Sequence, residues 1–150
     1  MRLGEYFKNG RPVLLTLVYY ECPMLCNQIL NSLTGTLTAM TFTPGKEFEV
    51  VTVSFDEREG PELAARKKET YLKRYKREGA GAGWHFLTGD KASIDALAGS
   101  VGFHYVWDEQ SHEVRRYGAD GRLAGPRPGL HALALKGEKA LLDRIGHGRA

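Results

Sequence analysis

Residues 13–20, Val-Leu-Leu-Thr-Leu-Val-Tyr-Tyr, form an almost unbroken apolar run. A strand with one solvated face alternates apolar and polar residues, whereas a continuous apolar run is typical of a strand covered on both faces. The run is too short to cross a bilayer, which takes about 20 residues. It therefore predicts a central strand in a sheet with a layer packed on each side.

Three further segments have strand character, and helical segments alternate with them. The expected strands are 48–55, 84–87 and 103–107, and the helices are expected to begin near Pro23, at Pro61 and after the N-cap Asp90. This alternation predicts an α/β domain with a largely parallel sheet and right-handed crossovers. With 150 residues, 42% of them hydrophobic, the chain is expected to form a single domain over residues 1–150.

The last third of the chain, residues 110–150, has a less regular pattern. Val114–Tyr117, followed by Asp120-Gly121, is expected to be a hairpin strand entering a turn. A final helix is expected over residues 138–145. Between them, Gly125-Pro126-Arg127-Pro128-Gly129 interrupts regular structure.

The net charge of +3 is small, but the basic residues are unevenly distributed. Residues 66–77 hold seven basic side chains against the single acid Glu69. The simplest interpretation is a solvated helix face; a functional one is contact with an acidic protein or an anionic lipid surface, weakened by salt. Nucleic-acid binding is not expected, because the basic residues are not regularly interleaved with exposed aromatic ones.

The two cysteines, Cys22 and Cys26, lie in one motif, Cys-Pro-Met-Leu-Cys, directly after the apolar run. A disulfide between them would close too small a loop to add much stability. Residues four apart on a helix have Cβ atoms about 5–6 Å apart, whereas a disulfide needs about 3.5–4.5 Å. Either the first turn adjusts to form a redox-active disulfide, or the two thiolates bind one soft metal ion. The start of a helix favours the thiolate form.

This motif and three later segments resemble the SCO/SenC family, thioredoxin-fold proteins of cytochrome c oxidase assembly. The similar segments are 13–26, 49–56, 83–90 and 101–108. The resemblance covers about residues 3–109. It implies a thioredoxin-like fold with a central, mainly parallel sheet flanked by helices.

The resemblance also implies copper binding through Cys22, Cys26 and a histidine further along the chain. Soft Cu(I) suits thiolates, and an imidazole completes a site that also accepts Cu(II). The implied partner is cytochrome c oxidase subunit II, whose dinuclear copper centre receives the metal or has its cysteines reduced. The implied location is the periplasmic side of the inner membrane, although the sequence contains no recognisable signal peptide or membrane anchor.

The position of the third ligand is open. Counting forward from Asp108 places Arg116 where the family has its histidine, whereas counting back from the Asp120-Gly121 turn selects His112. His112 is therefore the candidate third ligand. The apolar strand implied after the histidine is not recognisable, so the C-terminal hairpin region is interpreted as altered or incomplete. For that reason a weaker site with two thiolates alone, in which Cu(II) oxidises the cysteines, is favoured slightly over a site completed by His112.

Two classes of function follow. The first is a copper-binding, metallochaperone-like thiol protein for assembly of the dinuclear copper centre. The second is a thiol–disulfide oxidoreductase or peroxide-reducing enzyme of the thioredoxin superfamily. The CxxxC spacing favours the first, because general thioredoxin-like reductases use CxxC. Asp56, at the end of a strand, is a candidate outer hydrogen-bond acceptor for the site, and capping the turn before Pro61 is the equally open alternative.

Overall fold

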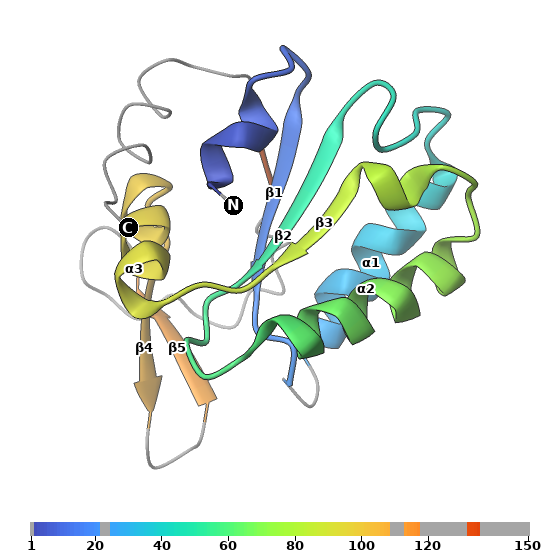
Figure 1. The fold of residues 1–150 in the computed structure, drawn as a ribbon. Coiled ribbons are helices and arrows are strands. Elements are labelled where there is room, and N and C mark those ends of the chain that lie inside the picture. The colour runs from blue at the N-terminus through green and yellow to red at the C-terminus, as the bar shows by residue number, and fades with distance from the viewer. Residues whose placement is uncertain (1, 22–24, 109–112, 118–131, 136–150) are drawn as a thin grey trace.

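The protein is described here from a computed structural model, which defines residues 2–21, 25–108, 113–117 and 132–135 (Figure 1). The strands are β1 (Val13–Val18), β2 (Glu49–Ser54), β3 (Trp84–Leu87), β4 (His104–Asp108), β5 (Glu113–Tyr117) and β6 (Ala132–Leu135). The helices are α1 (Leu25–Ala39), α2 (Pro61–Tyr75) and α3 (Lys91–Ser100), with short 3-10 helices η1 (Leu3–Phe7) and η2 (Ala80–Ala82).

The main sheet has the strand order β3-β2-β1-β6. β1 pairs in parallel with β2, and β2 in parallel with β3, whereas β6 is antiparallel to β1. Every residue of β2 is buried, and so is all of β1 except the half-buried Leu14. This burial confirms the prediction of a sheet core covered on both faces.

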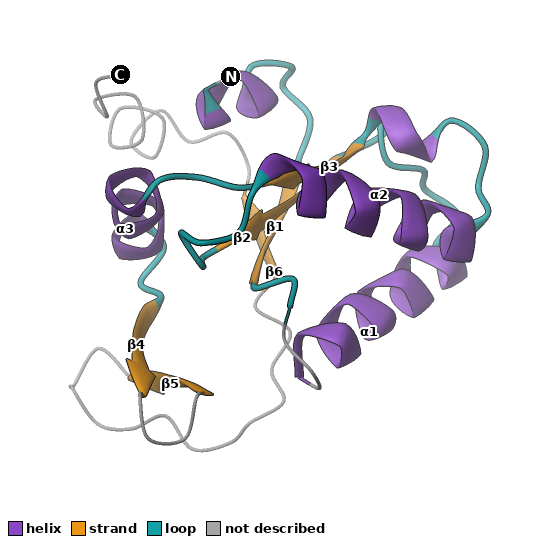
Figure 2. Ribbon diagram, turned by 60° about the horizontal axis from the view of Figure 1, so that its bottom comes forward, coloured by secondary structure: helices purple, strands orange, loops and turns teal. Residues whose placement is uncertain are grey.

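The two faces of the sheet are covered by different layers, as Figure 2 shows. α1 and α2 cover one face, where Leu30, Leu33 and Leu37 of α1 meet Tyr71 and Tyr75 of α2 in a buried cluster. η1 and α3 cover the other face, where their side chains pack on β1 and β2. The α/β, thioredoxin-like prediction is confirmed.

The expected start of the third helix is also confirmed. Asp90 is the N-cap of α3, and its carboxylate accepts a hydrogen bond of 2.7 Å from the Ser93 N–H. Ile94 and Leu97 face the core, as their spacing predicts.

The fourth strand lies outside the main sheet. β4 pairs with β5 in a separate antiparallel hairpin beyond α3 (Figure 1). The place beside β1 is taken by β6, an apolar strand that sequence analysis did not find in the C-terminal third. The hairpin strand expected at Val114–Tyr117 is present as β5, while the helix expected over 138–145 lies outside the described residues.

Part of the basic cluster holds the two helices of one layer together. The Lys67 ammonium donates to the Asn27 side chain at 3.2 Å, and the Arg74 guanidinium donates to the Asn31 side chain. The Arg77 guanidinium donates to carbonyl oxygens at and beyond the C-terminal end of α1. These carbonyls belong to Thr38, Met40 and Phe42. The interpretation of the whole cluster as a solvated face is therefore wrong for these three cations.

None of the helices within the described ranges has the length and apolar character needed to cross a membrane.

Candidate functional site

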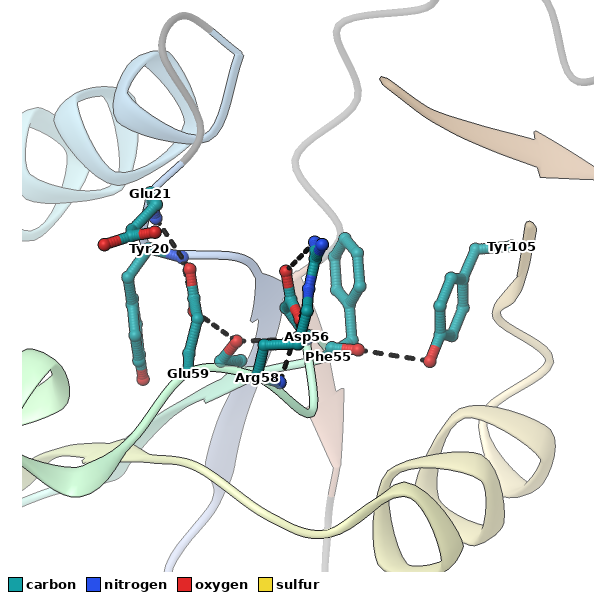
Figure 3. Close-up of polar contacts among 8 residues, drawn as sticks. Tyr20, Glu21, Phe55, Asp56, Arg58, Glu59 and Tyr105 are labelled. Carbon is teal, nitrogen blue, oxygen red and sulfur yellow. Dashed lines mark hydrogen bonds and ion pairs between the residues drawn. The ribbon is translucent and has the colours of Figure 1, made fainter. Parts of the chain in front are cut away.

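The candidate site lies where β1 and β2 end. Val18 and Ser54, the last residues of the two strands, are paired in register, so the segments that follow leave the same edge of the sheet. The segment after β1 leads into the cysteine motif, and the segment after β2 leads into α2 (Figure 3). In open α/β sheets this carboxyl edge is where functional groups gather.

Glu59 connects these two segments. Its side chain is buried, with the residue only 7% exposed. One carboxylate oxygen accepts from the Tyr20 N–H at 2.7 Å and from the Ser54 hydroxyl, and the other accepts from the Glu21 N–H at 2.7 Å. A buried carboxylate without hydrogen-bond donors is strongly unfavourable, so these three donors are what allow Glu59 to occupy this position.

Tyr20 is anchored through its side chain as well as its backbone. Its ring is buried, and its hydroxyl proton is shared between the Leu87 carbonyl at 2.8 Å and the Thr52 carbonyl at 3.1 Å. Burial raises the pKa of the Tyr20 hydroxyl far above its ordinary value, and nearby Glu59 raises it further. The chain is therefore held firmly two residues before Cys22.

Asp56 is paired with Arg58, and its carboxylate also caps the turn before Pro61 by accepting from the Arg58 N–H at 3.0 Å. The Asp56 carboxylate accepts from the Arg58 Nε at 2.8 Å and from a terminal guanidinium nitrogen at 2.6 Å. The Arg58 hydrogen bond is the main reason why the pKa of Asp56 lies below its ordinary value. The same guanidinium lies 4.7 Å from the centre of the Trp107 ring, a cation–π contact with β4.

A second contact also joins β4 to the site. The Tyr105 hydroxyl donates to the Phe55 carbonyl at 3.1 Å, and the two rings lie 4.9 Å apart (Figure 3). Burial raises the pKa of Tyr105 above its ordinary value. The β4–β5 hairpin is thus held against the segment that carries Asp56, Arg58 and Glu59.

An open cavity of about 550 Å³ lies over this network. Four carboxylates and two guanidinium groups contribute to its lining. The lining residues are Glu21, Asp56, Arg58, Glu59, Gly60, Pro61, Glu62, Leu63 and Arg66. The cavity is therefore polar, with an excess of negative charge, and it borders the residue that precedes Cys22.

The candidate ligands fall mostly outside the described residues. Cys22 and His112 are not described, and Cys26 lies in the first turn of α1 with its side chain undescribed. Elsewhere in the described part of the chain, no three His, Cys, Asp or Glu side chains come together as a metal site. Of the other histidines, His85 contacts Glu49 at 3.0 Å, in keeping with a structural role, and His104 is exposed.

The sequence pattern pointed to Asp56 and did not reveal Glu59. The segment Asp56-Glu57-Arg58-Glu59 contains three acids within four residues. The sequence alone does not show which of the three side chains points into the protein. The turn in which the Glu59 N–H donates to the Asp56 carbonyl at 3.1 Å sets that direction. One feature of the sequence could have indicated Glu59. This acid stands immediately before the Gly-Pro pair that begins a helix, in the segment that follows the strand next to the one leading into the cysteine motif.

A family model described as SCO1/SenC matches residues 4–121. The chain belongs to the SCO1/SenC family. The match includes both cysteines of the motif, and it ends within the region interpreted as divergent.

Solved structures support the fold of this SCO1/SenC protein. Arabidopsis thaliana ScoI with copper bound is 17% identical, with 89% of this chain and 80% of that chain covered and a TM-score of 0.53. Apo Sco1 from Thermus thermophilus is 23% identical, with coverages of 95% and 78% and a TM-score of 0.54. A protein from Aquifex aeolicus VF5 is 18% identical, with coverages of 97% and 84% and a TM-score of 0.57. No curated protein gives a significant sequence match.

The Asp56–Arg58 pair makes a testable contribution to acid sensitivity. Because the folded-state pKa of Asp56 lies below the ordinary value of 3.8, the pair stabilises the protein above that pH and ceases to do so as the pH falls through the folded pKa. We expect Asp56→Asn to lower the free energy of unfolding at pH 7 by up to about 1 kcal/mol, since the pair is partly exposed. Urea denaturation at a series of pH values measures the difference.

The loss should shrink below about pH 4, where the Asp56 carboxylate of the unfolded wild type becomes protonated, and it should vanish once the pH lies below the lowered folded pKa. Asp95→Asn, which removes the exposed partner of Lys91, serves as the comparison for an ordinary surface pair. A deficit for Asp56→Asn that stays constant down to pH 3 would contradict the assignment.

Proposed function

We propose that this SCO1/SenC protein binds copper through the Cys22 and Cys26 thiolates and delivers it to the dinuclear copper centre of cytochrome c oxidase subunit II. The observation that carries the proposal is the family match across the CxxxC motif, which follows β1 at the carboxyl edge of a thioredoxin-like sheet. The site of delivery implied by the family is the periplasmic side of the inner membrane.

The local chemistry favours thiolates at this position. Cys26 lies in the first turn of α1, whose free N–H groups and positive dipole end stabilise a nearby anion. No acidic residue occupies that turn, and the whole of α1 is uncharged. Two thiolates are the ligands that Cu(I) prefers, so only the reduced pair offers this donor set.

We assign the third ligand to His112. This residue immediately precedes β5, so the chain does continue as a strand after it. The other strand of the hairpin, β4, is held to the site through Trp107 and Tyr105. An imidazole added to two thiolates gives a mixed sulfur–nitrogen donor set, which accepts Cu(II) as well as Cu(I).

Copper titration of the reduced protein tests this function. We expect one Cu(I) bound per chain, and loss of binding in the Cys22→Ser, Cys26→Ser double variant, because no other soft thiolate is available. Oxidation of the loaded wild type should give a Cu(II) complex with sulfur and nitrogen ligands, measured by electron paramagnetic resonance. His112→Ala should lose that signal while still capturing Cu(I).

His104→Ala is the matched control, because His104 is an exposed histidine on the same hairpin. It should behave as wild type. A wild type that binds no Cu(I), but turns over a disulfide or peroxide substrate with an external electron donor, would instead establish the oxidoreductase alternative. A Cu(II) signal that survives in His112→Ala would reject His112 as the ligand.

We further propose that the free cations on α2 and at its C-cap attract an acidic protein partner. Lys67, Arg74 and Arg77 are engaged with α1, whereas the side chains of Arg66, Lys68 and Lys76 make no polar contact with the described residues. Arg66 also lines the cavity beside the motif. Charges placed there act on the approach of a partner and are screened by salt.

The variant Arg66→Gln, Lys68→Gln, Lys76→Gln tests this surface without cutting the contacts between α1 and α2. We expect unchanged copper stoichiometry and slower association with the soluble copper domain of an oxidase subunit II, measured by surface plasmon resonance at low salt. The difference from wild type should fade as ionic strength rises. Equal association rates at low salt, or binding lost only to anionic vesicles, would contradict a protein partner.

A further inference from the structure

The buried carboxylate of Glu59 binds the last two residues before the cysteine motif. Both of its oxygens are used in this way, one on the Tyr20 N–H and one on the Glu21 N–H, each at 2.7 Å. Cys22 follows Glu21 directly, and consecutive Cα atoms are about 3.8 Å apart. The start of the motif therefore lies one residue beyond a fixed point.

Glu59 is itself firmly fixed. The Ser54 hydroxyl donates to its carboxylate, its own N–H donates to the Asp56 carbonyl at 3.1 Å, and α2 begins two residues later at Pro61. With only 7% of the residue exposed, the side chain has no route to an alternative solvent-facing position without breaking these contacts. The carboxylate links a rigid part of the fold to the segment that delivers the first cysteine.

We propose that Glu59 is a positioning residue for the Cys22–Cys26 pair, and that its hold on the two N–H groups sets the equilibrium between disulfide and dithiol. The inference rests on the part of the proposed function that makes these cysteines the reactive pair. It does not depend on copper. Both carboxylate oxygens of Glu59 are engaged by N–H and hydroxyl donors, so its proposed action on the cysteines runs through the backbone.

The reaction concerned is a two-electron reduction. The Cys22–Cys26 disulfide takes up two electrons and two protons and becomes two thiols, while dithiothreitol supplies both and becomes its cyclic disulfide. Fixing the chain as far as Glu21 lowers the conformational entropy that is lost when the disulfide closes, and so favours the disulfide. A loosened entry raises that entropy cost and makes the disulfide easier to reduce.

Two substitutions separate position from charge. Glu59→Gln keeps the length but removes the charge and turns one acceptor into a donor, which cannot accept from a backbone N–H. Glu59→Asp keeps the charge but is one methylene shorter, so it cannot hold both N–H groups and the Ser54 hydroxyl. Loss of charge alone would also favour reduction, by making thiolates easier to form, so the Asp variant decides between the two causes.

The experiment is a redox titration of the full chain against dithiothreitol, with the thiol fraction measured by alkylation and mass spectrometry. We expect the equilibrium constant for reduction to rise about tenfold in both variants, which is about 30 mV for a two-electron couple. A shift in Glu59→Gln with a wild-type value in Glu59→Asp would overturn the proposal in favour of a charge effect. Wild-type values in both would overturn it outright.

Glu49→Gln is the matched control for a disturbed buried carboxylate. Glu49 is 4% exposed and is held by Arg11 at 3.1 Å and His85 at 3.0 Å. It lies at the opposite end of β2, about 16 Å from Ser54 at about 3.3 Å per residue. It should leave the equilibrium constant within about twofold of wild type, whatever it does to stability.

The remaining outcomes are also decisive. If neither Glu59 variant folds by circular dichroism, or if Glu49→Gln shifts the equilibrium as much as they do, Glu59 supports the fold in general and the proposal is wrong. A wild type without a reversible disulfide also contradicts it. A wild type that cycles with dithiothreitol and binds no copper would refute the proposed copper function while leaving the role of Glu59 to be judged by its own variants.

Discussion

The parallel pairing of β1 with β2 is the constraint on which the rest of the structure depends. All six residues of β1 are in register with β2, and almost all of both strands are buried. Because the two strands run in the same direction, they end together, and the segments after Val18 and Ser54 must leave side by side. The entry to the CxxxC motif and the entry to α2 are therefore neighbours.

Hydrogen bonding at that shared edge explains why it is polar and yet ordered. The carboxylate of Glu59 accepts hydrogen bonds from two backbone N–H groups and a hydroxyl, whereas the carboxylate of Asp56 is paired with the Arg58 guanidinium. The hydrogen bonds of Glu59 fix the segment that follows β1. The Arg58 guanidinium also contacts the Trp107 ring on β4. The cysteine entry and the hairpin that contains the candidate histidine are thus attached to one short segment, 55–60.

Much of the fold was predictable because burial leaves a simple periodic pattern. The apolar runs located β1, β2 and β3, and Pro61 and Asp90 marked the starts of α2 and α3. Strand pairing was harder to predict than strand position, because the sequence of β4 does not show that it pairs with β5 outside the main sheet. β6 escaped notice because Ala132–Leu135 is short and lies in a Gly- and Pro-rich region. The cysteines were identifiable from spacing, whereas the inward turn of Glu59 depends on tertiary contacts.

X-ray absorption at the copper edge of the Cu(I)-loaded, reduced protein tests the central claim most directly, because it counts the sulfur atoms bound to the metal. The account predicts two sulfur ligands per copper from Cys22 and Cys26, with a lighter nitrogen scatterer from His112. Cys26→Ser should leave one sulfur ligand. A copper ion surrounded only by nitrogen and oxygen in the wild type would show that this edge of the sheet is not a thiolate copper site.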